Sequence, residues 1–270
     1  MDEPIVAHLL ERMRAARRVV ALTGAGISAE SGLATFRDPQ TGYWSRFNPR
    51  ELASREGFAR DPRRVWAWYL LRRRKARQAS PNPGHYALAQ LQDIYPEVVV
   101  VTQNIDGLHT QAGSRDVIEL HGSLAGFRCF DEDIPVEYAE PAEAPAIVDD
   151  DPSSWPDVPR CPRCGGMLRP DVVWFGEALP VAAWLRAEEC ARACDLCLVV
   201  GTSAIVYPAA ALPLAARQAG ALLVEVNPEA TELTPMAALS LRGPAGEKLP
   251  WLVAQITPSE APSEGAGPLA

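Results

Sequence analysis

A glycine-rich segment near the N-terminus has residue types and spacing suited to binding phosphate groups. Residues 24–29 read Gly-Ala-Gly-Ile-Ser-Ala, the G-x-G-x-x-A form of the dinucleotide-binding fingerprint. They directly follow residues 19–22, an apolar run that predicts a β-strand. Glycines in such a loop permit a tight turn and close approach of a pyrophosphate, whose charge the N-terminus of a following helix would stabilise. The acidic residue that a dehydrogenase places on the ribose, about 20 positions further on, has no clear counterpart.

Four further apolar runs also end in polar residues. Residues 98–101, 117–120, 196–200 and 221–226 are followed by Thr-Gln-Asn-Ile-Asp, His-Gly, Gly-Thr-Ser and Asn-Pro, respectively. Helical patterns lie between the strands, at residues 84–92, 182–193 and 209–220. Alternating apolar strands and helices are typical of an α/β protein with a Rossmann-like parallel sheet covered on both faces. Such sheets bind ligands where the strands end, which is where these polar residues gather.

Two segments and a tail interrupt the alternation. Residues from about 37 to 81 are rich in Arg and Trp and predict an inserted helical module. Residues 125–170 contain three cysteines and an acidic, Pro-rich stretch. Residues 257–270 are rich in Pro, Ser, Glu and Gly, a composition that predicts disorder.

The composition restricts the partners and the compartment. The 270 residues are 47% hydrophobic and 22% charged, as in globular proteins, and the formal charge is −8. An acidic chain without a local basic patch has little attraction for nucleic acid. Residues 196–216 carry no charge, but Gly, Ser and Pro interrupt them, so that a strand and a core helix are expected instead of a membrane span. With no apolar leader and few cysteines, we expect a cytoplasmic protein that binds neither membranes nor nucleic acid.

Longer blocks of sequence surround the polar strand ends. Residues 24–32 read Gly-Ala-Gly-Ile-Ser-Ala-Glu-Ser-Gly, and residues 35–38 read Thr-Phe-Arg-Asp. Residues 102–109 read Thr-Gln-Asn-Ile-Asp-Gly-Leu-His, residues 119–122 Glu-Leu-His-Gly, residues 173–177 Val-Trp-Phe-Gly-Glu and residues 201–203 Gly-Thr-Ser. In this order they resemble the sirtuin family of NAD-dependent protein lysine deacylases. The resemblance implies a catalytic domain over residues 1–256, with a smaller domain formed by the helical insertion at 37–81 and a zinc-ribbon-like insertion at 125–170.

The resemblance also implies a reaction. In sirtuin-like chemistry the acyl oxygen of an acylated lysine attacks C1′ of the nicotinamide ribose as nicotinamide leaves. A histidine base then activates a ribose hydroxyl, which accepts the acyl group and yields free lysine and O-acyl-ADP-ribose. His121 matches the catalytic histidine of the family and imidazole titrates near neutral pH, whereas His8, His85 and His109 are interpreted as structural. Asn104 is the second catalytic residue that the resemblance implies.

The remaining site residues are assigned by the same residue-by-residue match. Asn104 and Asp106 would contact nicotinamide, Gln103 the ribose, and Ser203 and Asn227 the adenosine half. The residues expected to bind NAD are Gly24, Ala25, Gly26, Ser28, Glu30, Phe36, Arg37, Gln103, Asn104, Ile105, Asp106, Gly201, Thr202, Ser203, Asn227 and Ala245. Val173, Phe175 and Gly176 would pair with the backbone of the protein substrate as a β-strand.

Tyr69 and Arg72 suggest which acyl group is removed. Their spacing places them on one face of a helix, and it resembles the Tyr-x-x-Arg signature of sirtuins that remove succinyl and malonyl groups. A guanidinium binds a carboxylate in bidentate fashion, and a phenol can assist it. We therefore expect desuccinylase and demalonylase activity, with deacetylation as a secondary activity. The opposing interpretation is that Arg72 belongs to a solvated basic run at residues 72–77.

The cysteines depart from the family pattern. Sirtuins usually hold a structural Zn²⁺ with two Cys-x-x-Cys pairs. Here Cys161 and Cys164 form one pair, but Glu132 stands where the partner of Cys129 is expected. Two interpretations remain open: a zinc site of three thiolates and a carboxylate, supplied by Glu132 or a neighbouring Asp, or a module held by packing without metal.

Two other functions use the same NAD-binding elements. A mono-ADP-ribosyltransferase would deliver ADP-ribose to another nucleophile, but it has no need for Tyr69 and Arg72. A non-catalytic NAD-sensing module would not require His121, Asn104 and Asp106 together. The leading hypothesis is the lysine deacylase, whose partners are acylated lysine side chains of proteins.

Overall fold

The computed structural model describes residues 3–33, 45, 47–139, 147–148 and 151–257. The tail prediction for residues 257–270 concerns residues that lie outside this range except Thr257. Within the described residues, no helix has the length and apolar character needed to cross a membrane.

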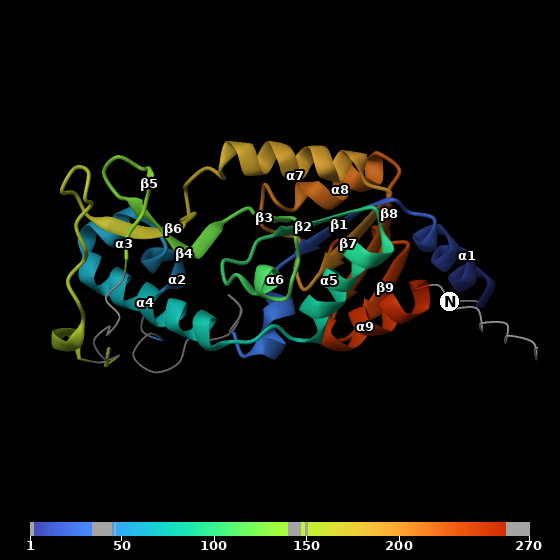
Figure 1. Ribbon diagram of the computed structural model, residues 1–270, viewed down its shortest axis with the longest axis horizontal. Coiled ribbons are helices and arrows are strands. Elements are labelled where there is room, and N and C mark those ends of the chain that lie inside the picture. The colour runs from blue at the N-terminus through green and yellow to red at the C-terminus, as the bar shows by residue number, and fades with distance from the viewer. Residues whose placement is uncertain (1–2, 34–44, 46, 140–146, 149–150, 258–270) are drawn as a thin grey trace, which may run out of the picture.

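The larger part of the molecule is built on a parallel sheet of six strands in the order β3-β2-β1-β7-β8-β9 (Figure 1). The strands are β1 (Arg18–Thr23), β2 (Glu97–Thr102), β3 (Val117–Glu119), β7 (Leu196–Val200), β8 (Leu222–Asn227) and β9 (Leu239–Arg242). Every pair of neighbours is parallel, which confirms the predicted fold class. The edge strand β9 was not predicted, because it is short and only one of its four residues is buried.

Helices cover both faces of this sheet, as the apolar strands require. On one face lie α1 (Glu3–Arg14), α5 (Pro83–Ile94) and α9 (Ala245–Ile256), and on the other lie α7 (Val181–Ala193) and α8 (Ala211–Gln218) (Figure 1). Alternate strand residues enter the two cores: Val19 and Ala21 pack with the first group of helices, and Val20 and Leu22 with the second. The chain runs outward from β1 in one direction through β2 and β3, and in the other through β7, β8 and β9. The strand order therefore reverses between β1 and β7, the place where open α/β sheets bind ligands.

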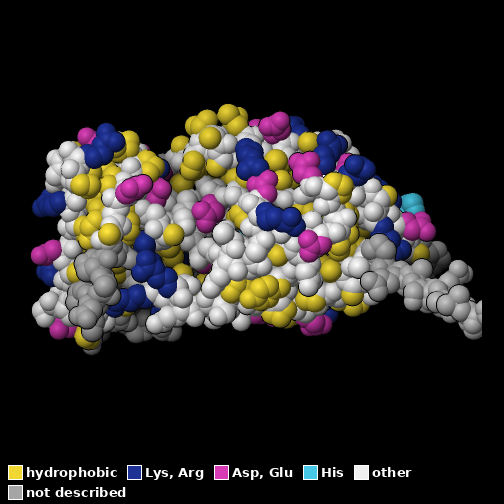
Figure 2. Space-filling model, viewed as in Figure 1, with side chains coloured by type: hydrophobic (Ala, Val, Ile, Leu, Met, Phe, Trp, Pro, Cys, Tyr) yellow, Lys and Arg dark blue, Asp and Glu magenta, His cyan; other side chains and the backbone are white. Residues whose placement is uncertain are grey.

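The two insertions fold together into a smaller module. The first forms α2 (Pro49–Leu52), α3 (Arg55–Arg60) and α4 (Pro62–Gln78), and the second contributes an antiparallel sheet of β5 (Pro135–Val136), β4 (Gly122–Cys129) and β6 (Leu168–Val172). They share a core of large aromatic residues that includes Phe58, Trp68, Tyr69, Trp155 and Trp174. Figure 2 shows the surface recessed between this module and the part that carries the parallel sheet.

The helix that follows the glycine loop is a 3₁₀ helix. It is η1 (Ala25–Ser31), and it begins directly after Gly24. The short elements α6 (Leu108–Gln111), η3 (Pro152–Ser154) and η4 (Thr234–Met236) complete the described structure.

Candidate active site

The glycine loop packs directly on the end of β7. The Gly24 amide donates to the Val200 carbonyl at 3.0 Å, and the Gly26 amide donates to the Gly201 carbonyl at 2.8 Å. A Cβ at Gly26 would lie 2.7 Å from that carbonyl oxygen, closer than two non-bonded atoms tolerate. The predicted glycine requirement therefore has a cause that the sequence does not reveal, which is contact between two strand-end loops.

The residues after β2 form a hydrogen-bonded cluster with this loop. The Asn104 side chain donates to the Gly24 carbonyl and to Ser28 Oγ, each at 3.1 Å. Ser28 Oγ in turn donates to an Asp106 carboxylate oxygen at 2.8 Å. Gln103 Nε2 donates to Thr202 Oγ1 at 3.1 Å. Asn104 is buried. Its side-chain amide is held in one orientation by the bonds to Gly24 and Ser28, which lie far from it in the sequence.

A second row of polar residues lies behind Asn104 and was missed by the sequence analysis. The backbone amide of Asn104 donates to Thr102 Oγ1 at 3.0 Å, and the Thr23 hydroxyl donates to the same oxygen at 2.8 Å. His109 Nε2 lies 2.9 Å from Thr23 Oγ1. Because the Thr23 proton is used on Thr102, His109 Nε2 must carry the proton that Thr23 accepts. The sequence signal that could have revealed this row is that β1 and β2 each end in a threonine, Thr23 and Thr102.

Residues assigned to the adenosine half also lie along this edge. Asn227 Nδ2 donates to the Thr202 carbonyl at 2.8 Å, which joins the ends of β7 and β8. The Glu30 carboxylate accepts from the Gly246 amide at 2.7 Å and so brings η1 beside Ala245, the first residue of α9. Ala25, Ile105, Gly201 and Ser203 lie in the same loops. Phe36 and Arg37 lie outside the described residues.

His121 occupies the turn between β3 and β4. Its Nδ1 lies 2.9 Å from the Gln103 carbonyl oxygen. A carbonyl only accepts, so Nδ1 carries the proton and Nε2 is the basic nitrogen of the neutral ring. Burial lowers the pKa of His121, and the bond to Gln103 opposes that shift in part. The other two buried histidines have pKa values lowered much further by burial, that of His85 to about 4 and that of His109 to about 3.

The predicted substrate-binding segment begins beside His121. The Val173 amide donates to the His121 carbonyl, and the Phe175 amide donates to the Ala53 carbonyl, both at 2.9 Å. The Trp174 amide donates to a Glu177 carboxylate oxygen at 2.9 Å. These three amides are thus bonded within the chain, and the Trp174 carbonyl accepts from the Glu177 amide at 3.0 Å. Phe175 and Gly176 are exposed at the surface.

Tyr69 and Arg72 share one face of α4, as their spacing predicts. The Tyr69 ring is buried, and its hydroxyl oxygen accepts a hydrogen bond from Trp174 Nε1 at 2.9 Å. The Arg72 guanidinium lies 4.9 Å from the centre of the Trp68 ring. Burial lowers the pKa of Arg72, while the charges of Tyr69 and Asp106 raise it. Arg72 therefore lies over the Trp68 ring and is only partly exposed, which argues against a fully solvated basic face.

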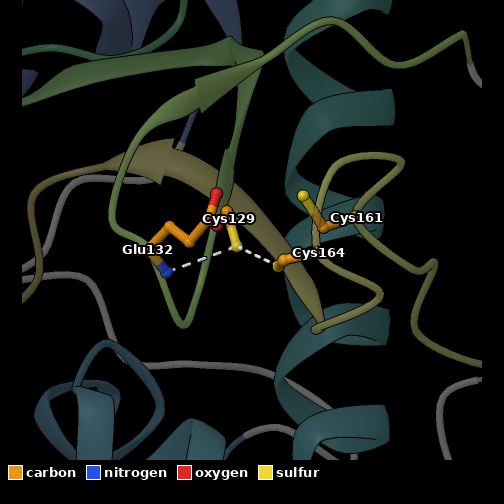
Figure 3. A group of neighbouring side chains, drawn as sticks. All are labelled: Cys129, Glu132, Cys161 and Cys164. Carbon is orange, nitrogen blue, oxygen red and sulfur yellow. Dashed lines mark hydrogen bonds between the residues drawn. The ribbon is translucent and has the colours of Figure 1, made fainter.

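The three cysteines and Glu132 come together in the smaller module (Figure 3). One ligand atom from each of Cys129, Glu132, Cys161 and Cys164 lies within 4.8 Å of all the others. The Glu132 and Gly166 amides each donate to a thiol sulfur, of Cys129 and Cys164 respectively, at 3.4 Å. Asp133 is excluded as a ligand because its carboxylate is paired with Arg55, Arg128 and Arg169. Three thiolates and one carboxylate form a donor set that Zn²⁺ accepts, so the residues present fit the ion.

The fold and the strand-end cluster define a nucleotide-binding α/β protein with an inserted cysteine module. The Sir2 family model matches residues 24–208, and the chain belongs to this family. It is 48% identical over 255 residues to "NAD-dependent protein deacylase 2" of Pyrobaculum aerophilum, which covers 92% of this chain and 95% of that relative. The solved structure of a Sir2 homologue–NAD complex is 45% identical, with a TM-score of 0.83 over 95% of this chain and 94% of its own. A Sir2–p53 peptide–NAD⁺ structure is 32% identical, with a TM-score of 0.75 over 94% and 98%.

Proposed function

We propose that this protein is an NAD-dependent protein lysine deacylase that acts on succinyl- and malonyl-lysine, with acetyl-lysine as a secondary substrate. NAD is its co-substrate, and the activity resides in residues 1–256. One observation carries the deacylase assignment. His121, whose basic nitrogen is fixed by its bond to Gln103, lies next in the structure to the hydrogen-bonded cluster in which Asn104 and Asp106 contact Ser28 of the glycine loop.

In this proposal each group has one task. The glycine loop and the residues after β7 and β8 bind the pyrophosphate and adenosine of NAD. Asn104 and Asp106 hold the departing nicotinamide, so that the acyl oxygen can displace it at C1′. His121 Nε2 then accepts a proton from a ribose hydroxyl, whose oxygen attacks the acyl carbon. Addition of water and cleavage of the acyl C–N bond release the lysine amine and leave the acyl group on ADP-ribose. The relatives named as deacylases and the NAD complex of a Sir2 homologue support this assignment.

Tyr69 and Arg72 on α4 support the proposed acyl preference. A succinyl or malonyl chain ends in a carboxylate, and burial of that charge requires paired hydrogen-bond donors. Arg72 supplies a guanidinium and Tyr69 a phenol from adjacent turns of α4. An acetyl group is smaller and is bound without using them.

A mass-spectrometric assay on one lysine peptide, succinylated or acetylated, with and without NAD, tests the function. We expect NAD-dependent loss of succinyl, faster than loss of acetyl, together with O-succinyl-ADP-ribose. Arg72→Met should lower the succinyl kcat/KM by roughly a hundredfold and the acetyl value little, because it removes a charge-assisted hydrogen bond and leaves the succinyl carboxylate unpaired. Lys75→Met, which removes an exposed charge from the same helix, is the matched control. Equal losses on both substrates for Arg72→Met would contradict the proposed acyl preference, and no turnover of either by the wild type would contradict the deacylase.

A further inference from the structure

The hydrogen bond between Trp174 and Tyr69 determines which way the Tyr69 proton points. An indole N–H is a donor only, so at 2.9 Å from Trp174 Nε1 the Tyr69 oxygen must accept. The phenol proton is then left for a partner on another side of that oxygen. Burial raises the pKa of Tyr69 far above its usual value, so the phenol keeps this proton at any working pH.

The neighbouring cation cannot take that proton. A guanidinium has five N–H donors and no acceptor, so Arg72 cannot receive a hydrogen bond from Tyr69. The Tyr69 proton therefore needs an acceptor that Arg72 cannot supply. A carboxylate accepts through two oxygens and is the group that matches a phenol and a guanidinium together.

Separate contacts hold the backbone and the ring of Trp174 in place. Its backbone amide is bonded to Glu177, and the Arg169 guanidinium lies 4.2 Å from the centre of its ring. Arg169 is also paired with Glu177 at 2.9 Å, so one ion pair fixes both the backbone and the ring of Trp174. Trp174 is 1% exposed and does not line the surface, which means that it acts through Tyr69.

We infer that Trp174 is a specificity-determining positioning residue, which makes the Tyr69 phenol a hydrogen-bond donor toward the carboxylate of an acidic acyl chain. This inference rests on the proposed function, because it names how that function discriminates between acyl groups. It predicts that Trp174 affects binding of acidic acyl-lysine and leaves acetyl-lysine turnover unchanged.

Removal of the indole N–H tests the inference. Trp174→Phe keeps an aromatic ring and should raise KM for the succinyl peptide by about tenfold with kcat unchanged, and change the acetyl values by less than about twofold. Tyr69→Phe should lower the succinyl-to-acetyl ratio to the same extent. In the Tyr69→Phe background, Trp174→Phe should have no further effect on the succinyl-to-acetyl ratio, because the Tyr69 hydroxyl that the Trp174 indole orients is already absent.

Two controls separate hydrogen bonding from folding. Trp155→Phe removes a different buried indole, bonded to the Val148 carbonyl in the same core, and should leave the succinyl-to-acetyl ratio unchanged. Trp174→Tyr, which fills more of the indole volume without an N–H at that position, is the second variant if Trp174→Phe does not fold. Thermal unfolding of each variant checks that the module is intact.

The outcomes distinguish this inference from the function on which it rests. A wild type that prefers acetyl-lysine overturns the proposed acyl preference and this inference with it. A wild type that prefers succinyl-lysine, with a folded Trp174 variant that loses both activities equally or neither, overturns the inference alone. An additive effect of Trp174→Phe and Tyr69→Phe on the ratio overturns it as well.

Discussion

At His121, a backbone carbonyl determines which nitrogen is basic. The Nδ1 proton is committed to Gln103, so a proton taken from a ribose hydroxyl must go to Nε2. His85 and His109 are unsuited to this task, since their pKa values of about 4 and about 3 make them poor proton acceptors near neutral pH. His121 is shifted in the same direction, but its bond to Gln103 stabilises the charged ring.

The pH dependence of the reaction should report this base. Because burial lowers the pKa of His121 from its usual 6.5, the neutral form predominates at pH 7. We expect kcat/KM to stay level near neutral pH and to fall as the pH drops through a midpoint below 6.5. His121→Ala should lower turnover by at least about a thousandfold, in line with loss of a general base, while NAD still binds in a calorimetric titration. Loss of NAD binding in that variant would indicate a structural role.

At the scale of elements, η1 packs tightly against the end of β7. A Cβ at Gly26 meets the backbone of Gly201, which cannot move away as a flexible side chain would. The strand-end loops of β1 and β7 would separate, and both belong to the predicted NAD site. Element packing therefore limits position 26 to glycine.

Gly26→Ala should accordingly weaken NAD binding by at least about tenfold and lower the unfolding midpoint, with overpacking costing about 1–3 kcal/mol. Gly32→Asn is the matched control, because a Cβ there meets none of the described atoms within 4 Å and Asn tolerates the positive φ of 79° at this position better than other side chains do. Equal NAD affinity for the Gly26 variant and the wild type, measured by calorimetry, would contradict this account.

Most elements follow from local pattern, and the exceptions have physical causes. The five predicted strands are apolar on both faces and so stand out in the sequence, whereas β9 reads Leu-Ser-Leu-Arg and lies at the sheet edge. The helix expected after Gly24 is a 3₁₀ helix that ends at Gly32 in a left-handed conformation. The glycine fingerprint does not specify this type of helix.

At the scale of the whole molecule, the cysteine cluster joins segments that lie up to 35 residues apart. The sequence left open which acidic residue stands in for the fourth cysteine, because side-chain direction in a turn is not encoded by spacing. The structure places the Glu132 carboxylate with the three thiols and ties Asp133 to arginines. Likewise, the pairing of Trp174 with Tyr69 spans 105 residues and has no local signal.

Metal analysis should find about one zinc per chain in the purified protein, held by three thiolates and Glu132. A carboxylate is a weaker ligand than a thiolate for this ion, so Glu132→Cys should retain zinc longer than the wild type against a chelator, and Glu132→Ala should lose it faster. Glu137→Ala, which removes an exposed carboxylate elsewhere in the same module, is the control. Protein without zinc that unfolds at the same temperature with and without chelator would support a module held by packing alone.

The hydrogen bond from the Val173 amide to the His121 carbonyl joins the segment that we propose contacts the substrate to the residue that we propose as the base. That amide proton can exchange with deuterium only when the two separate. Its exchange rate therefore reports how often the Val173 amide separates from His121. Slower exchange on addition of NAD or acyl-peptide would measure how much each ligand reduces that separation.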